Sequence, residues 1–167
     1  IQVESVVVKD DVAVPDSTYS TGRRGIAGTM FVHKIAGAMA ETGAPLSEVA
    51  GVAREVVENL RSMGMAMSPC ILPAVGRPGF TLGENEIEIG MGIHGEPGVE
   101  KTTMKTAKEI AAILLQKILD DYDYAGSEVA VLVNGLGGTP LMELYILNYE
   151  VQNLLKEKNI TAYKTFV

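Results

Sequence analysis

The segment 128–134 (EVAVLVN) constrains the fold most, because it is a short apolar run of strand-forming residues bounded by a turn. The turn is GLGG (135–138), and Thr139 and Pro140 are residue types favoured at a helix N-cap and at the first helical position. A helical apolar pattern then extends to KEKN (156–159), and a last strand-like segment follows it. This succession of strand, helix and strand predicts an α/β fold.

The rest of the chain continues this mixture of elements. Further strands are predicted at 3–8 (VESVVV) and at 86–94 (EIEIGMGIH), the second with strict alternation of side-chain type. Further helices are expected at three places: 27–43, 47–64 with Ser47 as N-cap, and 103–120. We therefore expect a layered mixed β-sheet packed with about four α-helices.

The composition is that of a globular protein, with 47% apolar and 21% charged residues in a length that suits one domain. No apolar run approaches the roughly 20 residues that a membrane-spanning helix needs. The net charge is −7 and no basic block occurs, whereas a nucleic-acid surface needs clustered Lys and Arg. We therefore expect neither a membrane nor a nucleic acid as a partner.

The chain begins and ends in strand-like sequence and has no initiator methionine. We therefore interpret residues 1–167 as a single α/β domain that is a fragment of a longer subunit. The sequence shows no secretion signal, and its single cysteine, Cys70, excludes an internal disulfide. Both features favour a cytoplasmic location.

The segment 90–103 (GMGIHGEPGVEKTT) raises the question of a phosphate-binding loop. Within it, 95–102 (GEPGVEKT) matches the motif G-x-x-x-x-G-K-[ST] except that Glu100 replaces the second glycine. A carboxylate at that position would repel the phosphate, and Pro97 removes an amide donor. We therefore reject the phosphate-binding loop.

Zinc and a cysteine nucleophile are the next alternatives. His94-x-Glu96 resembles the H-x-E of zinc deaminases, but the P-C-x-x-C that such a site needs does not follow it. Two histidines and one cysteine make a tetrahedral zinc site hard to assemble. A carboxylate-rich magnesium site stays an alternative, but no spacing points to one, so no metal site is predicted. Cys70 could pair with His94 as a nucleophile, but its apolar neighbours favour a buried core cysteine.

Three other polar motifs are interpreted as structural, each beside a functional alternative. His33 lies mid-helix and is expected to be partly buried and hydrogen-bonded. Arg23 and Arg24, like the glycine turn 135–138, precede a helix N-terminus and could attract an anion. An equally simple interpretation is that the arginines are solvated and that the glycines form a tight turn.

His94 is the leading candidate for a functional residue. On the predicted strand it would share a face with Gly90 and Gly92, which would leave bare space beside the imidazole. The turn that follows begins with Gly95 and Glu96 and would fix the direction of the ring. The sequence therefore predicts a histidine presented to a small ligand, with a core histidine as the alternative.

Four motifs in this chain resemble the K subunit of dihydroxyacetone kinase. They are TGRRGIAGT (21–29), GRPGFTL (76–82), NEIEIGMGIHGEPG (85–98) and LVNGLGGTPLMELY (132–145). They occur in family order and correspond to the middle to later half of that subunit. The resemblance implies that this is the subunit's second domain, and that the first domain and the end beyond Val167 are absent.

The resemblance also implies a reaction. The histidine of GIHGEPG corresponds to His94 and forms a hemiaminal with the carbonyl carbon of dihydroxyacetone, in a site shaped by Gly90, Gly92, Gly95 and Glu96. Glycerol has no carbonyl group and would be rejected. A neutral imidazole is a competent nucleophile, and an ordinary histidine ionises at about pH 6.5, so binding is expected to weaken below about pH 6.

Further implications concern cofactors and partners. This domain would bind no cofactor, and ADP or ATP with magnesium would be held by a partner, in bacterial members an L subunit recharged through a phosphotransferase M subunit. A K-subunit homodimer is also implied. The family's acid/base histidine and aspartate would lie in the absent first domain, so the fragment alone is expected to be inactive. The alternative is a non-catalytic paralogue that senses dihydroxyacetone and acts as a transcriptional coactivator.

Overall fold

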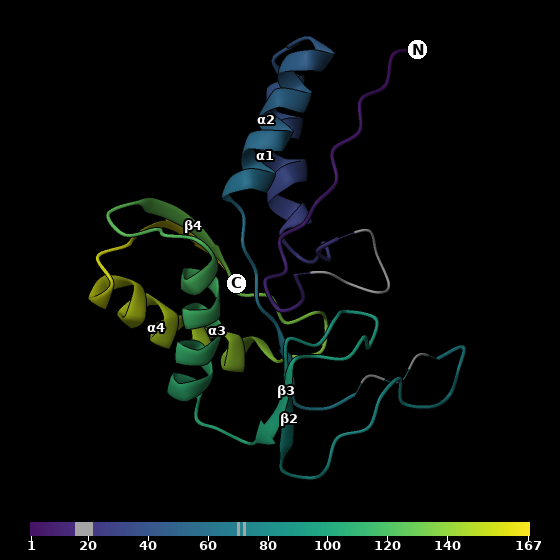
Figure 1. Cartoon of the computed structure of the whole chain (residues 1–167), viewed down its shortest axis with the longest axis vertical. Coiled ribbons are helices and arrows are strands. Elements are labelled where there is room, and N and C mark those ends of the chain that lie inside the picture. Colours follow the sequence, from purple (N-terminus) through teal and green to yellow (C-terminus); the bar gives the residue numbers. More distant parts are fainter. Residues whose placement is uncertain (16–21, 70, 72) are drawn as a thin grey trace. The chain divides into compact units, whose positions relative to one another are not determined.

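The computed structural model describes residues 1–15, 22–69, 71 and 73–167. Within them the chain forms two compact units, Ile1–Ser62 and Met63–Val167. Helices and strands are mixed, with four helices and five strands among the described residues, so the predicted α/β class is confirmed (Figure 1). That the two units act as a single domain stays a prediction.

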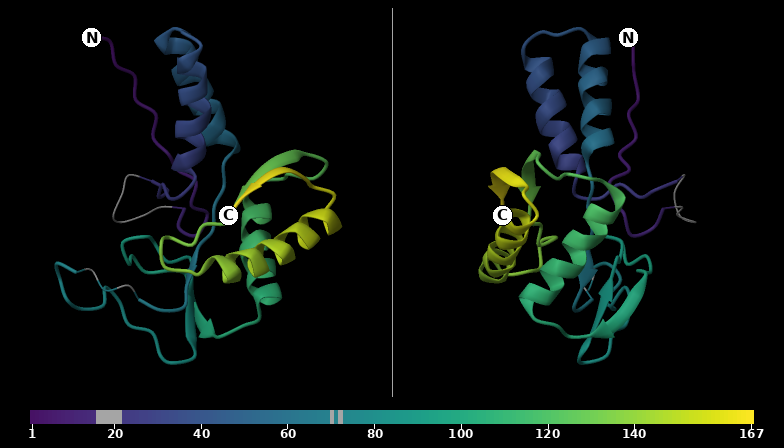
Figure 2. Two further views of the ribbon diagram at one scale, coloured as in Figure 1. Left: turned by 180° about the vertical axis from the view of Figure 1, so that it is seen from behind. Right: turned by 60° about the vertical axis from the view of Figure 1, so that its left-hand side comes forward.

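The first unit is built on a pair of helices, α1 (Thr29–Glu41) and α2 (Leu46–Asn59), which lie side by side (Figure 2). Gly43 has a φ of +82° between them, so the predicted helix stop there is confirmed. Apolar residues at helical spacing close the interface. The buried ones are Val32, Ala53 and Val57, and Val6, Val8, Ala36, Val56 and Leu60 pack around them.

The predicted strand at 3–8 is wrong. Residues 1–10 run extended beside the helices but pair with no strand among the described residues. Val6 and Val8 instead pack against the helix pair. The β-branched pattern was satisfied by packing on helices, which buries apolar side chains as well as a sheet does.

Within its described residues, the second unit contains two sheets. Strands β1 (Met65–Ala66), β2 (Glu86–Ile89) and β3 (Glu100–Thr103) are antiparallel in that order. Strands β4 (Glu128–Leu132) and β5 (Thr161–Phe166) are parallel, which confirms the strands expected at the C-terminal end. The mixed character of the prediction is therefore correct, but the strands lie in two sheets rather than one.

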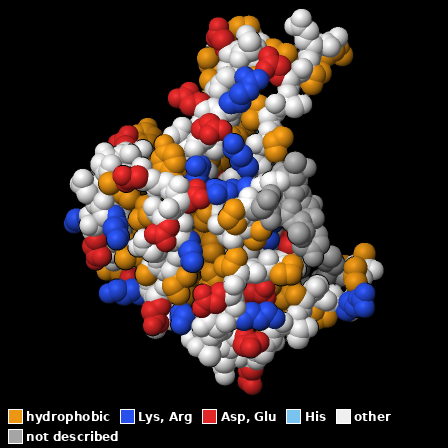
Figure 3. All heavy atoms as spheres, viewed as in Figure 1, with side chains coloured by type: hydrophobic (Ala, Val, Ile, Leu, Met, Phe, Trp, Pro, Cys, Tyr) orange, Lys and Arg blue, Asp and Glu red, His pale blue; other side chains and the backbone are white. Residues whose placement is uncertain are grey.

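Two helices complete the second unit, α3 (Ala107–Asp121) and α4 (Leu141–Glu157), and they pack on each other. The core lies between them and β2. It contains the buried Ile87, Ile89 and Ile110, with Met63, Met65, Ile113, Leu114 and Leu147 around them. On the face drawn in Figure 3, acidic and basic side chains are interspersed.

Helix starts were predicted less well than the helices themselves. Helix α2 begins at Leu46 and has no side-chain cap, so Ser47 is not its N-cap, and it ends at Asn59 rather than 64. Helix α4 begins after Pro140, one residue later than expected. Helix α3 begins at Ala107 instead of 103, because residues 100–103 pair with β2.

The strand predicted over 86–94 is shorter than expected, because β2 ends at Ile89. Gly90 has a φ of +78°, a left-handed conformation that interrupts an extended strand and that glycine adopts readily. Its N–H donates to the carbonyl of Gly64 at 2.7 Å. As a result Met91 is still buried, but Ile93 and His94 lie in a turn and are exposed.

Candidate functional site

The residues that connect β2 and β3, 90–99, form a short loop that we call the His94 loop. Its base is closed by the N–H of Val99, which donates to the carbonyl of Ile89 at 2.8 Å. Inside it, the N–H of Gly92 donates to the carbonyl of Glu96 and the N–H of Gly95 donates to that of Gly92, both at 3.0 Å. The stiff turn predicted from the sequence is therefore present.

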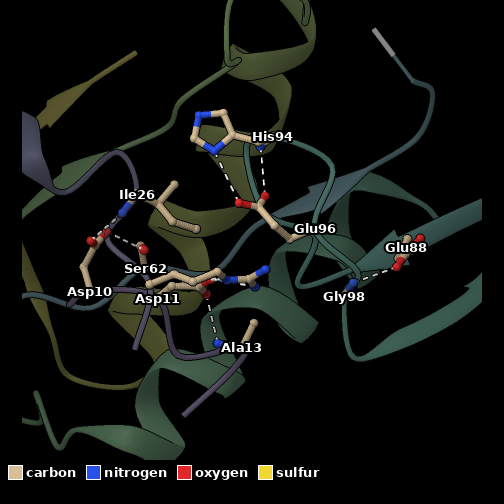
Figure 4. A network of polar contacts seen from close by, with 10 residues as sticks. Asp10, Asp11, Ala13, Ile26, Ser62, Glu88, His94, Glu96 and Gly98 are labelled. Atoms are coloured by element: carbon tan, nitrogen blue, oxygen red, sulfur yellow. Dashed lines mark hydrogen bonds and ion pairs between the residues drawn. The ribbon is translucent and has the colours of Figure 1, made fainter. Parts of the chain in front are cut away.

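His94 lies at the tip of this loop, and its side chain is 80% exposed. The carboxylate of Glu96 faces it with both oxygens (Figure 4). Oε2 accepts a hydrogen bond from the backbone N–H of His94 at 3.0 Å, and Oε1 lies 3.3 Å from Nδ1 of the ring. The structure thus brings together two residues that the sequence singled out, and the core-histidine alternative is wrong.

The Glu96 carboxyl is electrostatically stabilised in its charged form. Burial by itself would raise its pKa. This effect is outweighed by hydrogen bonds from the backbone N–H groups of Glu96 and His94, together with the nearby histidine ring. The net pKa of Glu96 lies below its ordinary value. The group beside the imidazole is therefore a carboxylate at neutral pH.

Gly90 and Gly92 do not have the geometry expected of them. They were predicted to share a strand face with His94, but the strand ends before them and both are buried. Their contribution is made through the backbone, because Gly90 turns the chain out of β2 and Gly92 closes the turn onto Glu96. Whether they shape a ligand site stays a prediction.

Glu88 is a residue of the site that sequence reasoning missed. Glu88 is only 6% exposed, and its Oε1 atom accepts a hydrogen bond from the N–H of Gly98 at 2.7 Å. This bond joins β2 to the end of the His94 loop. Lys101 lies near the other oxygen, with Nζ 3.8 Å from Oε2. The sequence did offer a signal, because Glu88 stands between two isoleucines of a predicted strand. A charge buried there requires a partner.

The motif GRPGFTL (76–82) lies next to the His94 loop. A Cβ atom built on Gly95 would be 3.5 Å from Cδ1 of Phe80. On the other side, Nζ of Lys101 donates to the carbonyl of Thr81 at 3.4 Å. Two motifs that are separate in the sequence therefore meet here, although the prediction treated them independently.

The near match to a phosphate-binding motif takes a different structure. Glu100 and Lys101 belong to strand β3, whereas that motif requires the Lys to open a helix. The N–H of Gly98, in the middle of the segment, is already occupied by the carboxylate of Glu88. The rejection of a phosphate-binding loop is confirmed.

The remaining candidates fall elsewhere. His33 lies on α1 and is exposed, so the expected partial burial is wrong. The turn at 135–138 is tight as predicted, with a φ of +80° at Gly137 and the N–H groups of Gly138 and Thr139 donating to the carbonyl of Gly135. Cys70 lies outside the described residues.

Arg24 is the clearest correction. It was expected to be solvated, but it is 7% exposed and pairs with the fully buried Asp11. Nε and Nη2 each lie 2.7 Å from Oδ2 of Asp11, and the N–H of Ala13 donates to Oδ1 at 2.9 Å. Burial raises the pKa of Asp11, and the Ala13 hydrogen bond and the charge of Arg24 only partly offset it.

Asp10, also fully buried, organises the start of α1 in the same unit. Its carboxylate accepts the N–H groups of Ile26 at 2.8 Å and Gly28 at 3.0 Å, and the hydroxyl of Ser62 at 2.6 Å. Arg24, Ile26 and Gly28 of the motif TGRRGIAGT (21–29) are therefore held from inside by two buried acids.

Among the residues that the structure describes, no three or more His, Cys, Asp and Glu side chains gather into a set that could hold a metal ion. None of the helices described above is both long and apolar enough to cross a bilayer.

A family model described as the Dak1 domain matches residues 1–167. The dihydroxyacetone-binding subunit DhaK of a PTS-dependent dihydroxyacetone kinase from Listeria innocua is 49% identical over 168 residues, which cover 100% of this chain and 51% of that protein. The chain thus spans about half the length of the curated relatives it matches.

Solved structures agree. The dihydroxyacetone kinase operon co-activator Dha-DhaQ has a TM-score of 0.86 and 33% identity, over 96% of this chain and 50% of that one. The dihydroxyacetone kinase from C. freundii in complex with AMP-PNP and Mg²⁺ has a TM-score of 0.81 and 33% identity, over 97% of this chain and 30% of that one. The resemblance noted in the sequence motifs is confirmed.

Proposed function

Because the chain belongs to the Dak1 domain family, we propose that it forms the dihydroxyacetone-binding part of a dihydroxyacetone kinase. The complete protein is then a phosphotransferase that acts on an alcohol group. The His94 loop carries the proposal, because it presents an exposed imidazole on a hydrogen-bonded turn. His94 is the site of covalent substrate attachment, and Gly90, Gly92, Gly95 and Glu96 shape that site.

The chemistry suits a small ketone. A neutral imidazole attacks the carbonyl carbon and forms a reversible hemiaminal. A three-carbon substrate has few atoms for non-covalent contacts, so the bond provides selectivity that contacts alone could not. It also fixes the substrate hydroxyl for in-line phosphoryl transfer, a reaction that depends largely on positioning.

The phosphoryl donor belongs to a partner in this proposal. ADP or ATP with magnesium is held by an L subunit or an equivalent domain, recharged in phosphotransferase-dependent systems through an M subunit. Acid/base groups come from outside this chain, and the K subunit forms a homodimer in the cytoplasm. The relatives named as PTS-dependent kinase subunits, and the kinase solved with AMP-PNP and Mg²⁺, support this arrangement.

Carbon-13 NMR of the protein with dihydroxyacetone labelled at its carbonyl carbon tests the attachment. We expect the carbonyl signal to be replaced by that of a tetrahedral carbon, and His94→Asn to abolish the change. His33→Asn is the matched control, because His33 is also an exposed histidine. A bound ketone that keeps its carbonyl signal in the wild-type protein would overturn the proposal.

A second function is favoured by one observation, the likeness to the co-activator Dha-DhaQ. In that case the same His94 loop binds dihydroxyacetone as a signal and no phosphoryl transfer follows. Adding a donor subunit and nucleotide to the full-length protein separates the two. Phosphorylated dihydroxyacetone supports the kinase, whereas a tetrahedral adduct without turnover supports the sensor.

A further inference from the structure

One carboxylate holds His94 at two points. Glu96 accepts the backbone N–H of His94 through Oε2 at 3.0 Å, while its Oε1 lies 3.3 Å from the ring nitrogen Nδ1. The two contacts lie on either side of the bonds that set the direction of the imidazole. Glu96 therefore restrains the orientation of the His94 ring relative to the backbone of His94.

The backbone that carries this carboxylate is itself held in place. The carbonyl of Glu96 accepts the N–H of Gly92 at 3.0 Å, and the loop continues into Gly98, whose N–H is bound by the buried Glu88. The Glu96 side chain is only 21% exposed, against 80% for His94. An anchored acceptor thus faces a ring that is otherwise open to solvent.

The chemistry of the pair selects one tautomer. An ionised carboxylate can only accept hydrogen bonds, and a neutral imidazole carries one N–H and one lone pair. A lone pair on Nδ1 would face a negatively charged oxygen at 3.3 Å, whereas an N–H there would be attracted to it. The other ring nitrogen, Nε2, faces away from the carboxylate (Figure 4).

We propose that Glu96 is a positioning residue that keeps the proton of neutral His94 on Nδ1 and so leaves Nε2 as the nucleophilic nitrogen. This inference rests on the proposed function, because it assigns the atom that bonds to the ketone. The role resembles that of groups that orient a histidine through one nitrogen so that the other can react.

The Nε2 lone pair forms a bond to the carbonyl carbon, and the π pair of the C=O bond moves to its oxygen. That oxygen takes up one proton from solvent. The ring keeps its Nδ1 proton and becomes an imidazolium, whose positive charge faces the Glu96 carboxylate. Loss of the ketone reverses each of these changes.

The tautomer can be read without any ketone. Nitrogen-15 NMR of the side chain, at about pH 8.5 so that an ordinary imidazole is neutral, is expected to place the proton of His94 on Nδ1. In Glu96→Gln the carboxamide can present its NH₂ to Nδ1, and the proton is expected to move largely to Nε2. Glu100→Gln, which makes the same charge change on exposed strand β3, should leave the tautomer unchanged.

Adduct formation is the second measurement. Because only the Nδ1–H tautomer is competent, apparent affinity for labelled dihydroxyacetone should fall by about tenfold in Glu96→Gln, in proportion to the competent fraction. Glu100→Gln should bind as the wild type does. If the wild-type protein forms no tetrahedral adduct, the proposed function fails, whatever the tautomer.

The inference about Glu96 fails separately. It is overturned if wild-type His94 carries its proton on Nε2, or if Glu96→Gln leaves both tautomer and affinity unchanged while the adduct still forms. A Glu96→Gln variant with weaker binding but an unchanged tautomer also contradicts it, because a general loosening of the loop would explain that result.

Discussion

Glu88 and Gly98 are joined by a hydrogen bond of 2.7 Å from the Gly98 N–H to the Oε1 atom of the buried carboxylate. The bond connects the last turn of the His94 loop to the strand that precedes the loop. At the same place the chain approaches so closely that a Cβ atom on residue 98 would lie 2.2 Å from the carbonyl oxygen of Ile89. Strand β2 thus supports the loop through one side chain and one tight backbone contact.

Gly98→Ala is expected to destabilise the second unit by about 1–3 kcal/mol, because the added methyl group must displace backbone. Urea unfolding followed by circular dichroism measures the loss. Gly138→Ala is the control, since a Cβ atom there would meet nothing within 4 Å. Equal stabilities of the two variants would contradict the close approach.

Glu88→Met should cost about 1–3 kcal/mol, because the Gly98 N–H loses its acceptor in a part-buried position. Glu88→Gln keeps an acceptor oxygen and is expected to cost less than the methionine variant. Amide hydrogen exchange at Gly98 gives a local measurement, with faster exchange in Glu88→Met alone. Similar exchange in both variants would show that this carboxylate does not hold the loop.

Arg24→Met should destabilise the first unit by about 3–5 kcal/mol at neutral pH, because it leaves the fully buried Asp11 as an uncompensated charge. Lys34→Met, an exposed change of the same charge on α1, is expected to have little effect. Thermal unfolding of both variants makes the comparison. Equal losses would mean that the ion pair is not the cause.

The pH dependence of Arg24→Met provides a separate check. Burial raises the pKa of Asp11 in the folded protein above its ordinary value of 3.8. The folded protein therefore binds this proton more tightly than the unfolded chain does, and ionisation of Asp11 lowers the stability as the pH rises above 3.8. Removing Arg24 should raise the pKa of Asp11 further. The stability difference from wild type is therefore expected to shrink as pH falls from neutral, and a constant difference would contradict this assignment.

The start of α3 should be sensitive to acid. Thr106 and Glu109 form a capping box, and the Thr106 hydrogen bonds lower the pKa of Glu109 below its ordinary value of 4.5. Because the pKa of Glu109 is lowered in the folded protein, its contribution to stability is fully present at pH values above the ordinary pKa. That contribution is lost as the pH falls through the pKa of the folded state. Amide exchange at Thr106 and Glu109 should accelerate at that point.

Thr106→Ala should cost about 1 kcal/mol and weaken this acid sensitivity, because the hydroxyl contact with Glu109 is lost while the backbone N–H of residue 106 still donates to it. Glu143→Gln is the matched control, because Glu143 also lies in a first turn but α4 has no side-chain cap. Acid sensitivity that is as large in Thr106→Ala as in the wild type would place its origin elsewhere.

Dihydroxyacetone and glycerol should differ sharply as ligands of the full-length protein. Both have three carbons, but only the ketone offers a carbonyl carbon to His94. Titration followed by the His94 ring signals is expected to saturate with the ketone, and to show no change with glycerol at the same concentrations. Equal responses would argue for hydrogen bonding rather than covalent attachment.

Several elements were readable from the sequence because their signals are local. The helices α1 to α4 follow from apolar periodicity, and the βαβ succession at the end of the chain follows from turn residues between apolar runs. The strand at 3–8 failed for the opposite reason. Its pattern shows that Val6 and Val8 seek an apolar surface, but not that helices supply it.

The candidate site, too, could be predicted from the sequence only in part. A glycine-rich turn around His94, followed by an acid two residues later, is a local arrangement, and the sequence by itself determined that the imidazole would be presented on a stiff loop. The sequence also carried motifs of the Dak1 domain family, to which the chain belongs.

Only the tertiary structure decided what holds these motifs. Glu88 reaches Gly98 ten residues away, and Asp11 reaches Arg24 across thirteen. In both cases the deciding quantity is burial, since an exposed carboxylate would need no partner and a buried one must have it. Burial depends on how distant segments pack, and no local pattern reports it.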